Sequence, residues 1–176
     1  MGARRDEEFV EFVTAHRHDL VRAAVLLCAG DETMAEDLVQ TTLTRLYLSW
    51  GRMSRAKSQL AYARASLTHA LIDEMRRAYR RRERTHESPG QLAGPGQVEG
   101  SDPHLRQVVL TALATLGPRQ RAVVVLRHWF DLDTAETARI LGCSVGTVKS
   151  QNARGLAHLR ELLGDLERDF FLEVGL

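Results

Sequence analysis

The sequence predicts an all-α protein made of two small helical domains joined by a flexible linker. Apolar residues recur at helical spacing, three and four positions apart, along most of the 176 residues. The stretch 85–103 interrupts this pattern with four glycines and three prolines. Downstream, residues 133–160 contain two capped segments around a glycine. A chain of this length, with 44% hydrophobic residues, can form one ordinary domain or two small ones.

Three helices are predicted before the linker. The first ends near Ala29, where Gly30 is a natural terminator. Thr33 and Glu36 form a capping-box pattern that predicts the start of the second helix, whose apolar stripe runs to Trp50. The segment 51–57 breaks the periodicity and predicts a basic loop, and a third helix then continues to just before Ser88.

The linker sets the predicted domain boundaries. Its Gly- and Pro-rich composition cannot bury a core, so it predicts a flexible connection rather than a packed element. We therefore expect a first domain over residues 1–84, a linker over 85–103 and a second domain over 104–176.

The second domain is predicted to end in a helix-turn-helix. Asp133 and Ser144 are in position to cap two helices, and Gly142 suits the turn between them. The second of these helices places Lys149, Ser150, Ala153 and Arg154 on one polar and basic face, which can enter a DNA major groove. An ordinary helical hairpin is the alternative interpretation, since such patterns also arise by chance.

Composition and motifs limit the class of protein. The net charge is only +1, yet residues 76–84 hold six arginines against one glutamate. The two cysteines lie far apart without a CxxC pattern, and no apolar run is long enough to span a membrane, so we expect a cytoplasmic protein that is not in the membrane. The sequence contains no GxxxxGK[ST], HExxH or GxSxG motif, and its histidines are scattered, so we expect no enzyme activity, catalytic residues, cofactor or metal.

Three segments, in order, carry a resemblance to a known family. They are AEDLVQTTLTRLYLSW, AYARASLTHALIDEMRR and LGPRQRAVVVLRHWFDLDTAETARILGCSVGTVKSQNARGLAHLREL. The chain resembles bacterial RNA polymerase sigma factors of the extracytoplasmic-function (ECF) type, within the SigE-like group of actinobacteria. The resemblance covers nearly the whole chain. It implies a protein that binds core RNA polymerase and directs transcription initiation at a subset of promoters.

The resemblance assigns the first segment to core-polymerase binding. A polar face beside an apolar stripe suits such an interface, although a solvated helix face would explain each polar residue equally well. The residues expected to bind polymerase are Asp37, Gln40, Arg45, Leu46 and Trp50.

The second segment resembles the one that holds the minus-ten promoter element. Recognition of single-stranded DNA needs a basic groove with groups that stack on or hydrogen-bond to a base. Thr68 stands where the family often has Asn, and a hydroxyl cannot make the bidentate contact that an amide makes to adenine. The arginine run that follows is expected to grip duplex phosphates, with a solvated helix end as the alternative. The expected minus-ten residues are Arg55, Lys57, Tyr62, Arg64, Thr68, His69, Arg76, Arg77, Arg80 and Arg81.

The helix-turn-helix resembles the domain that binds the minus-thirty-five element. In this family match, Lys149, Ser150, Ala153 and Arg154 face the bases, where Arg can pair with guanine and Ala can pack on a thymine methyl. Phosphate contact or orientation of neighbours is expected from Ser144, Thr147 and Gln151. Gln151 stands where many relatives have Arg, and Asn152 interrupts the apolar stripe.

A second function fits the helix-turn-helix alone. A stand-alone DNA-binding regulator that acts as a dimer would explain the second domain and would prefer a palindromic site. It would not explain the polymerase-binding segment or the arginine run. The partners expected from the resemblance are core RNA polymerase and promoter DNA, and an anti-sigma factor is a further one that it allows. The apolar and acidic tail 165–176 is expected to extend the last helix over apolar surface, with docking of a regulator as the alternative.

Overall fold

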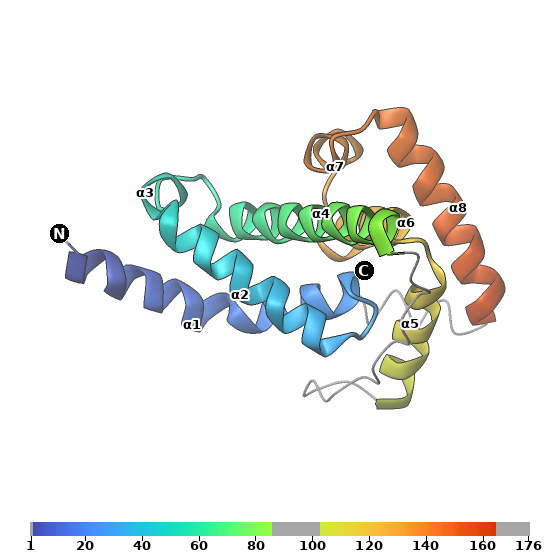
Figure 1. Ribbon diagram of the computed structural model, residues 1–176, viewed down its shortest axis with the longest axis horizontal. Helices are drawn as coiled ribbons and strands as arrows, with labels where there is room; N and C mark the ends of the chain where they lie inside the picture. The colour runs from blue at the N-terminus through green and yellow to red at the C-terminus, as the bar shows by residue number, and fades with distance from the viewer. Residues whose placement is uncertain (1, 86–102, 165–176) are drawn as a thin grey trace.

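The protein is built of helices, and no strand occurs in the part of the chain that the structure describes (Figure 1). This computed structural model describes residues 2–85 and 103–164, but not the side chains of 78–85, 103 and 105. The predicted linker and tail lie almost entirely outside these residues. The helices are α1 Gly2–Leu27, α2 Glu32–Leu48, α3 Trp50–Met53, α4 Gln59–Thr85, α5 Pro103–Thr115, α6 Pro118–Val124, the π-helical turn η1 Val125–Trp129, α7 Thr134–Leu141 and α8 Val145–Leu163.

The first half is a three-helix layer of α1, α2 and α4, with α3 at one end (Figure 1). Helix α1 ends at Leu27 because Ala29 and Gly30 turn the chain with φ of 54° and 87°. The prediction that Thr33 begins the second helix is wrong. Asp31 is the N-cap, and its carboxylate accepts a hydrogen bond from the N–H of Met34 at 2.9 Å.

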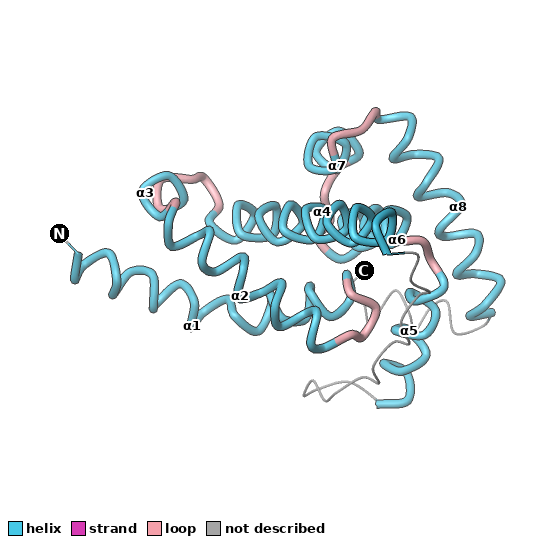
Figure 2. The backbone as a smooth tube through the Cα atoms, viewed as in Figure 1, coloured by secondary structure: helices cyan, strands magenta, loops and turns pink. Residues whose placement is uncertain are grey.

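The predicted loop over 51–57 is only partly correct. Residues 51–53 of this segment belong to helix α3, and a short loop then leads to α4 (Figure 2). The long third helix is confirmed as α4, and Gly117 and Pro118 separate α5 from α6. Pro118 occupies the first turn of α6, where its missing N–H costs nothing.

The largest apolar cluster draws on both halves of the chain. It joins residues of α1, α2 and α4, such as Leu27, Leu38 and Leu71, to residues of α5–α8 such as Leu113 and Ile140. A second cluster belongs to the first half alone and centres on Trp50. The two helical parts on either side of the predicted linker therefore share one apolar core in this arrangement.

Gly155 lets α8 cross close to α6. A Cβ atom built on Gly155 would lie 2.8 Å from Val124 Cγ2 and 3.2 Å from Gln120 Cγ. Val124 is buried and β-branched, so it cannot turn aside. We expect Gly155→Ala to lower the free energy of unfolding by about 1–2 kcal/mol, since overpacking outweighs the gain in helix propensity.

Gly146→Ala on the same helix is the matched control for chemical denaturation. Its Cβ would meet only Ser144 Oγ, at 3.7 Å. We expect Gly146→Ala to keep or raise the free energy of unfolding, by up to about 1 kcal/mol. Equal changes in the two variants would mean that the close α6–α8 crossing is not what requires glycine.

Candidate functional site

The helix-turn-helix forms with both predicted caps. The Asp133 carboxylate accepts a hydrogen bond from the N–H of Glu136 at 2.7 Å and begins α7. Gly142 ends α7 with a left-handed φ of 62°, and the Ser144 hydroxyl accepts from the N–H of Thr147 at 3.1 Å to begin α8. The two capping hydrogen bonds and the glycine turn together set the position of the first turn of α8 relative to α7.

Helix α8 keeps its predicted DNA face open. Its apolar side is buried, with Val148 and Leu159 in the core. The four residues expected to face bases, Lys149, Ser150, Ala153 and Arg154, are all exposed. Of those expected near phosphates, Ser144 and Thr147 are exposed and Gln151 is half-buried. The structure therefore brings all seven predicted residues to one end of α8.

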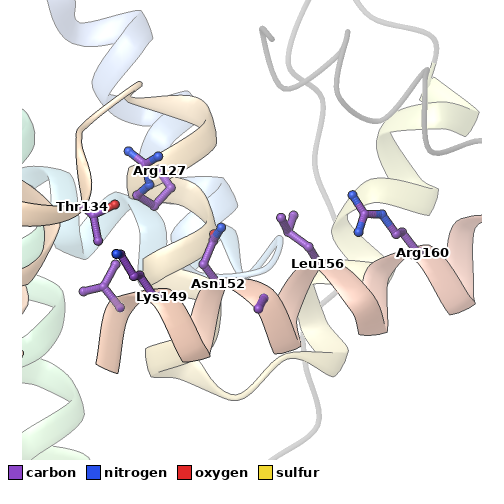
Figure 3. Close-up of a pocket in the computed structure, with 8 residues that line it drawn as sticks. Arg127, Thr134, Lys149, Asn152, Leu156 and Arg160 are labelled. Atoms are coloured by element: carbon purple, nitrogen blue, oxygen red, sulfur yellow. The ribbon is translucent and has the colours of Figure 1, made fainter. Parts of the chain in front are cut away.

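A basic cleft of about 360 Å³ lies beside this face (Figure 3). Lys149 and Arg160 of α8 line it, and Arg127 reaches it from η1, where its guanidinium also donates to the Leu132 carbonyl. The apolar residues Val148 and Leu156 also line the cleft. Sequence reasoning missed Arg127 and Arg160. Arg160 follows Lys149 by 11 positions, a spacing that returns to the same side of a helix, but nothing local places Arg127 opposite α8.

Asn152, which interrupts the apolar stripe of α8, has a polar partner. Its Oδ1 lies 3.1 Å from His128 Nε2 of η1. Burial lowers the pKa of His128, and the contact with Asn152 partly opposes that shift. An imidazole and an amide thus join η1 to α8, so the polar residue in the apolar stripe is accommodated by a hydrogen bond.

The predicted polymerase-binding residues divide into exposed and buried sets. Asp37 and Gln40 are exposed on α2. Arg45 is half-exposed and pairs with Asp73 of α4 at 2.9 Å. Leu46 and Trp50, in contrast, are 0% and 4% exposed, so they do not lie on the surface in this arrangement.

Trp50 is the centre of an aromatic cluster between α1 and α3. Its ring meets Phe9 edge-on, with centroids 5.4 Å apart, and lies 5.9 Å from the ring of Phe12. The indole N–H donates to the Glu8 carboxylate at 3.3 Å. Leu46 packs in the same cluster. Both residues therefore belong to the packing of α1 against the end of α2 and α3.

The predicted minus-ten residues are placed in three ways. Arg55, Lys57, His69, Arg76 and Arg77 are exposed. Tyr62 packs against the aromatic cluster, Arg64 lies over the Phe130 ring at 5.0 Å, and Thr68 is 0% exposed with its hydroxyl donating to the Arg64 carbonyl. The side chains of Arg80 and Arg81 lie outside the described residues.

The described residues offer no cluster that resembles a metal site. No group of three or more His, Cys, Asp or Glu side chains there is arranged to hold a metal ion. Cys28 and Cys143 are both free thiols, and burial raises the pKa of Cys28 to about 12. Among the same residues, no helix has the length and apolar content to cross a membrane.

Comparison with known proteins identifies matches to two family regions. Residues 12–81 match Sigma-70 region 2, and residues 106–159 match Sigma-70, region 4. The RNA polymerase sigma-E factors of Streptomyces avermitilis and Streptomyces coelicolor are 37% and 38% identical over 163 and 157 residues, covering 92% and 89% of this chain and 88% and 86% of theirs. The ECF RNA polymerase sigma factor SigC of Mycobacterium tuberculosis is 31% identical over 163 residues, covering 90% and 83%.

A solved structure has a similar fold. It is the sigma factor RpoE in complex with the anti-sigma factor NepR from Bartonella quintana, with a TM-score of 0.72 and 25% identity over 89% of this chain and 97% of that one. Neither half of this chain alone makes up 89% of its length, so the similarity includes both halves.

Proposed function

The chain belongs to the sigma-70 family of bacterial RNA polymerase sigma factors, as an ECF member of the sigma-E type, and we propose that separate helix faces bind polymerase and the two promoter elements. It is a sigma factor that binds core RNA polymerase and directs initiation at specific promoters. The proposal rests on one observation. The chain matches Sigma-70 region 2 and then Sigma-70 region 4, and the part that matches region 4 contains a helix-turn-helix with an exposed face. We assign residues 1–84 to polymerase and minus-ten binding and residues 104–176 to minus-thirty-five binding.

The polymerase surface that we propose is the exposed side of α2. Asp37, Gln40 and Arg45 supply charge and hydrogen bonds to the partner. Leu46 and Trp50 act beneath them, since their burial suits a supporting role better than direct contact. The Arg45–Asp73 ion pair then fixes the outer edge of this surface.

The minus-ten surface that we propose lies on the α3–α4 loop and α4. Arg55 and Lys57 are exposed on the loop, and His69 is exposed on α4. Arg76, Arg77 and the rest of the arginine run grip phosphates upstream, which contributes affinity but little sequence information. Tyr62, Arg64 and Thr68 complete the assignment, although Arg64 and Thr68 are engaged within the chain in this arrangement.

The minus-thirty-five surface that we propose is the exposed face of α8. Lys149, Ser150, Ala153 and Arg154 face the bases, because an exposed helix with a short basic face fits the major groove. Ser144, Thr147 and Gln151 meet phosphates or orient neighbours. The basic cleft adds Arg127 and Arg160 as further phosphate-binding groups.

Cellular setting and partners follow from this function. We place the protein in the cytoplasm, where the polymerase and the promoters are, and assign it no catalytic role of its own. An anti-sigma factor is a proposed third partner, as one is present in the solved RpoE structure. A stand-alone dimeric regulator is not favoured, because that function does not explain the match to Sigma-70 region 2.

Co-elution with core RNA polymerase, followed by transcription from genomic promoter fragments, tests the proposed function. We expect the purified chain to co-elute as a monomer with core polymerase and to start transcripts at specific sites, while core polymerase alone does not. Absence of binding to core polymerase, combined with a dimer that holds palindromic duplex DNA, would instead support the stand-alone regulator.

A further inference from the structure

The two helices of the helix-turn-helix begin with the same kind of cap. Asp133 before α7 and Ser144 before α8 each accept a hydrogen bond from the backbone N–H three residues later. The second residue of the helix is Ala135 in α7 and Gly146 in α8, and both residues are exposed. The first turns of the two helices can therefore be compared position by position.

The first turn of α8 is less favourable for a helix than that of α7. Alanine has the highest helix propensity, whereas glycine is unfavourable because it loses the most backbone freedom on folding. Helix α7 also has Glu136 in its first turn, where α8 has Thr147 and no acidic residue. A carboxylate at this position stabilises the start of a helix. Helix α8 thus lacks two stabilising features that α7 has.

The fold gives no reason for glycine at position 146. Gly142 has a left-handed φ of 62°, and Gly155 lies against Val124, so those two positions need glycine. Gly146 lies within α8 and is not among the residues of positive φ. Among the described residues, a Cβ atom built on Gly146 would meet only Ser144 Oγ, at an ordinary contact distance of 3.7 Å. An alanine would therefore fit there without strain.

Gly146 lies on the proposed minus-thirty-five surface. Residues three and four positions apart share one side of a helix, and Lys149 and Ser150 follow Gly146 at these two spacings. Both of them are exposed, and both are assigned to the bases. In Figure 1 the start of α8 lies at the outer edge of the structure, beside α7. The N-terminal residues of the second helix are the ones that contact base edges in helix-turn-helix proteins.

We propose that Gly146 is a DNA-contact residue: base edges of the minus-thirty-five duplex lie against the bare backbone of α8 at this position, closer than a Cβ atom would allow. The inference rests on the proposed function, because it concerns α8 bound to its duplex. Glycine allows a backbone to approach a ligand closely. Natural sequences break local stability rules chiefly at functional sites, and the weak first turn of α8 is such a break.

Gly146→Ala is expected to be at least as stable as wild type, yet to bind the native duplex roughly 5- to 150-fold more weakly. The added methyl group holds the groove away from α8, as an extra methyl group does in a well-packed contact. Gly146→Leu tests the effect of size, because leucine and alanine are both good helix formers. We expect it to weaken binding further. Neither substitution changes a charge, so the salt dependence of binding should stay that of wild type.

Ala135→Gly is the matched control, because it makes the reverse change at the equivalent position of α7. It is expected to lower the free energy of unfolding and to leave duplex affinity unchanged. Full-length wild type and the three variants, each bound to core polymerase, are titrated with two labelled duplexes. One carries the minus-thirty-five element of a promoter mapped in the transcription assay, and the other carries a scrambled element. Urea denaturation of each free protein gives its stability.

We expect the loss of affinity in Gly146→Ala and Gly146→Leu to be larger for the native duplex than for the scrambled one. If Gly146→Leu does not fold, Gly146→Ala carries the test. Equal weakening of both duplexes would overturn the inference, since the contact would then be with the sugar–phosphate backbone. A Gly146→Ala protein that is less stable than wild type would also overturn it, because the fold itself would then require the glycine.

Native-duplex affinities that are alike in wild type and Gly146→Ala, with both proteins directing initiation by core polymerase, would overturn this inference alone. Failure of every protein, wild type included, to direct initiation would overturn the proposed function instead.

Discussion

Trp50→Ala is expected to lower the free energy of unfolding by about 3–5 kcal/mol. The indole is 4% exposed, packs against Phe9 and Phe12, and donates to the Glu8 carboxylate. Its removal leaves a cavity between α1 and α3 and deprives Glu8 of a donor. Urea denaturation followed by circular dichroism measures the loss. Polymerase binding should fall with it, to the extent that the first half unfolds.

Leu48→Ala is the control that distinguishes a loss of stability from the loss of a direct contact with polymerase. Leu48 is two positions away in sequence but 75% exposed at the end of α2, so its removal should leave the free energy of unfolding unchanged. Any loss of polymerase affinity in Leu48→Ala would then report a direct contact. A Trp50→Ala protein that is as stable as wild type, yet does not bind polymerase, would contradict the supporting role and make Trp50 itself a contact.

Local features of the fold could be predicted from the sequence. The caps at Asp133 and Ser144, the turn at Gly142 and the break at Pro118 depend on side chains within three or four residues of the backbone that they affect. Apolar periodicity likewise places Val148 and Leu159 in the core. The exposure of the residues assigned to the minus-thirty-five element could be predicted for the same reason, since a single helix presents them.

The sequence pattern gives the wrong N-cap for α2, because two residues there can cap a helix. Asp31 and Thr33 both precede an acidic residue and an apolar stripe, and both residue types can cap a helix. The turn at Ala29 and Gly30 favours Asp31, because it brings the chain into α2 two residues earlier than the Thr33 pattern suggests. Glu36 is then free to pair with Arg17 instead of closing a capping box.

Features that depend on distant residues could not be predicted. The family resemblance assigns Trp50 and Leu46 to polymerase binding, but α1 covers them with Phe9 and Phe12, about forty residues earlier in the chain. Arg127 enters the cleft of α8 only through packing of η1. The contact between Arg64 and Phe130 joins two halves for which the linker composition alone gives no relative position.

Arg154→Ala is expected to remove discrimination at the minus-thirty-five element while polymerase binding is kept. Arg154 is exposed on α8, far in sequence from the proposed polymerase surface on α2. A guanidinium that pairs with guanine contributes about 1–3 kcal/mol of discrimination against other bases, so preference for the native element over a single-base variant should fall about 5- to 150-fold. Competition binding to the two duplexes measures this ratio, and co-elution measures polymerase binding.

Arg160→Gln is the matched control, since Arg160 lies on the same helix but lines the basic cleft. A phosphate-binding arginine carries no base information, so its loss should weaken both duplexes alike and lower the salt dependence of binding by about one ion. Discrimination that survives Arg154→Ala would place the base contact on another residue of the α8 face. Equal loss of DNA discrimination and polymerase binding in Arg154→Ala would mean that the substitution disturbs the fold, and the separation of the two surfaces would fail with it.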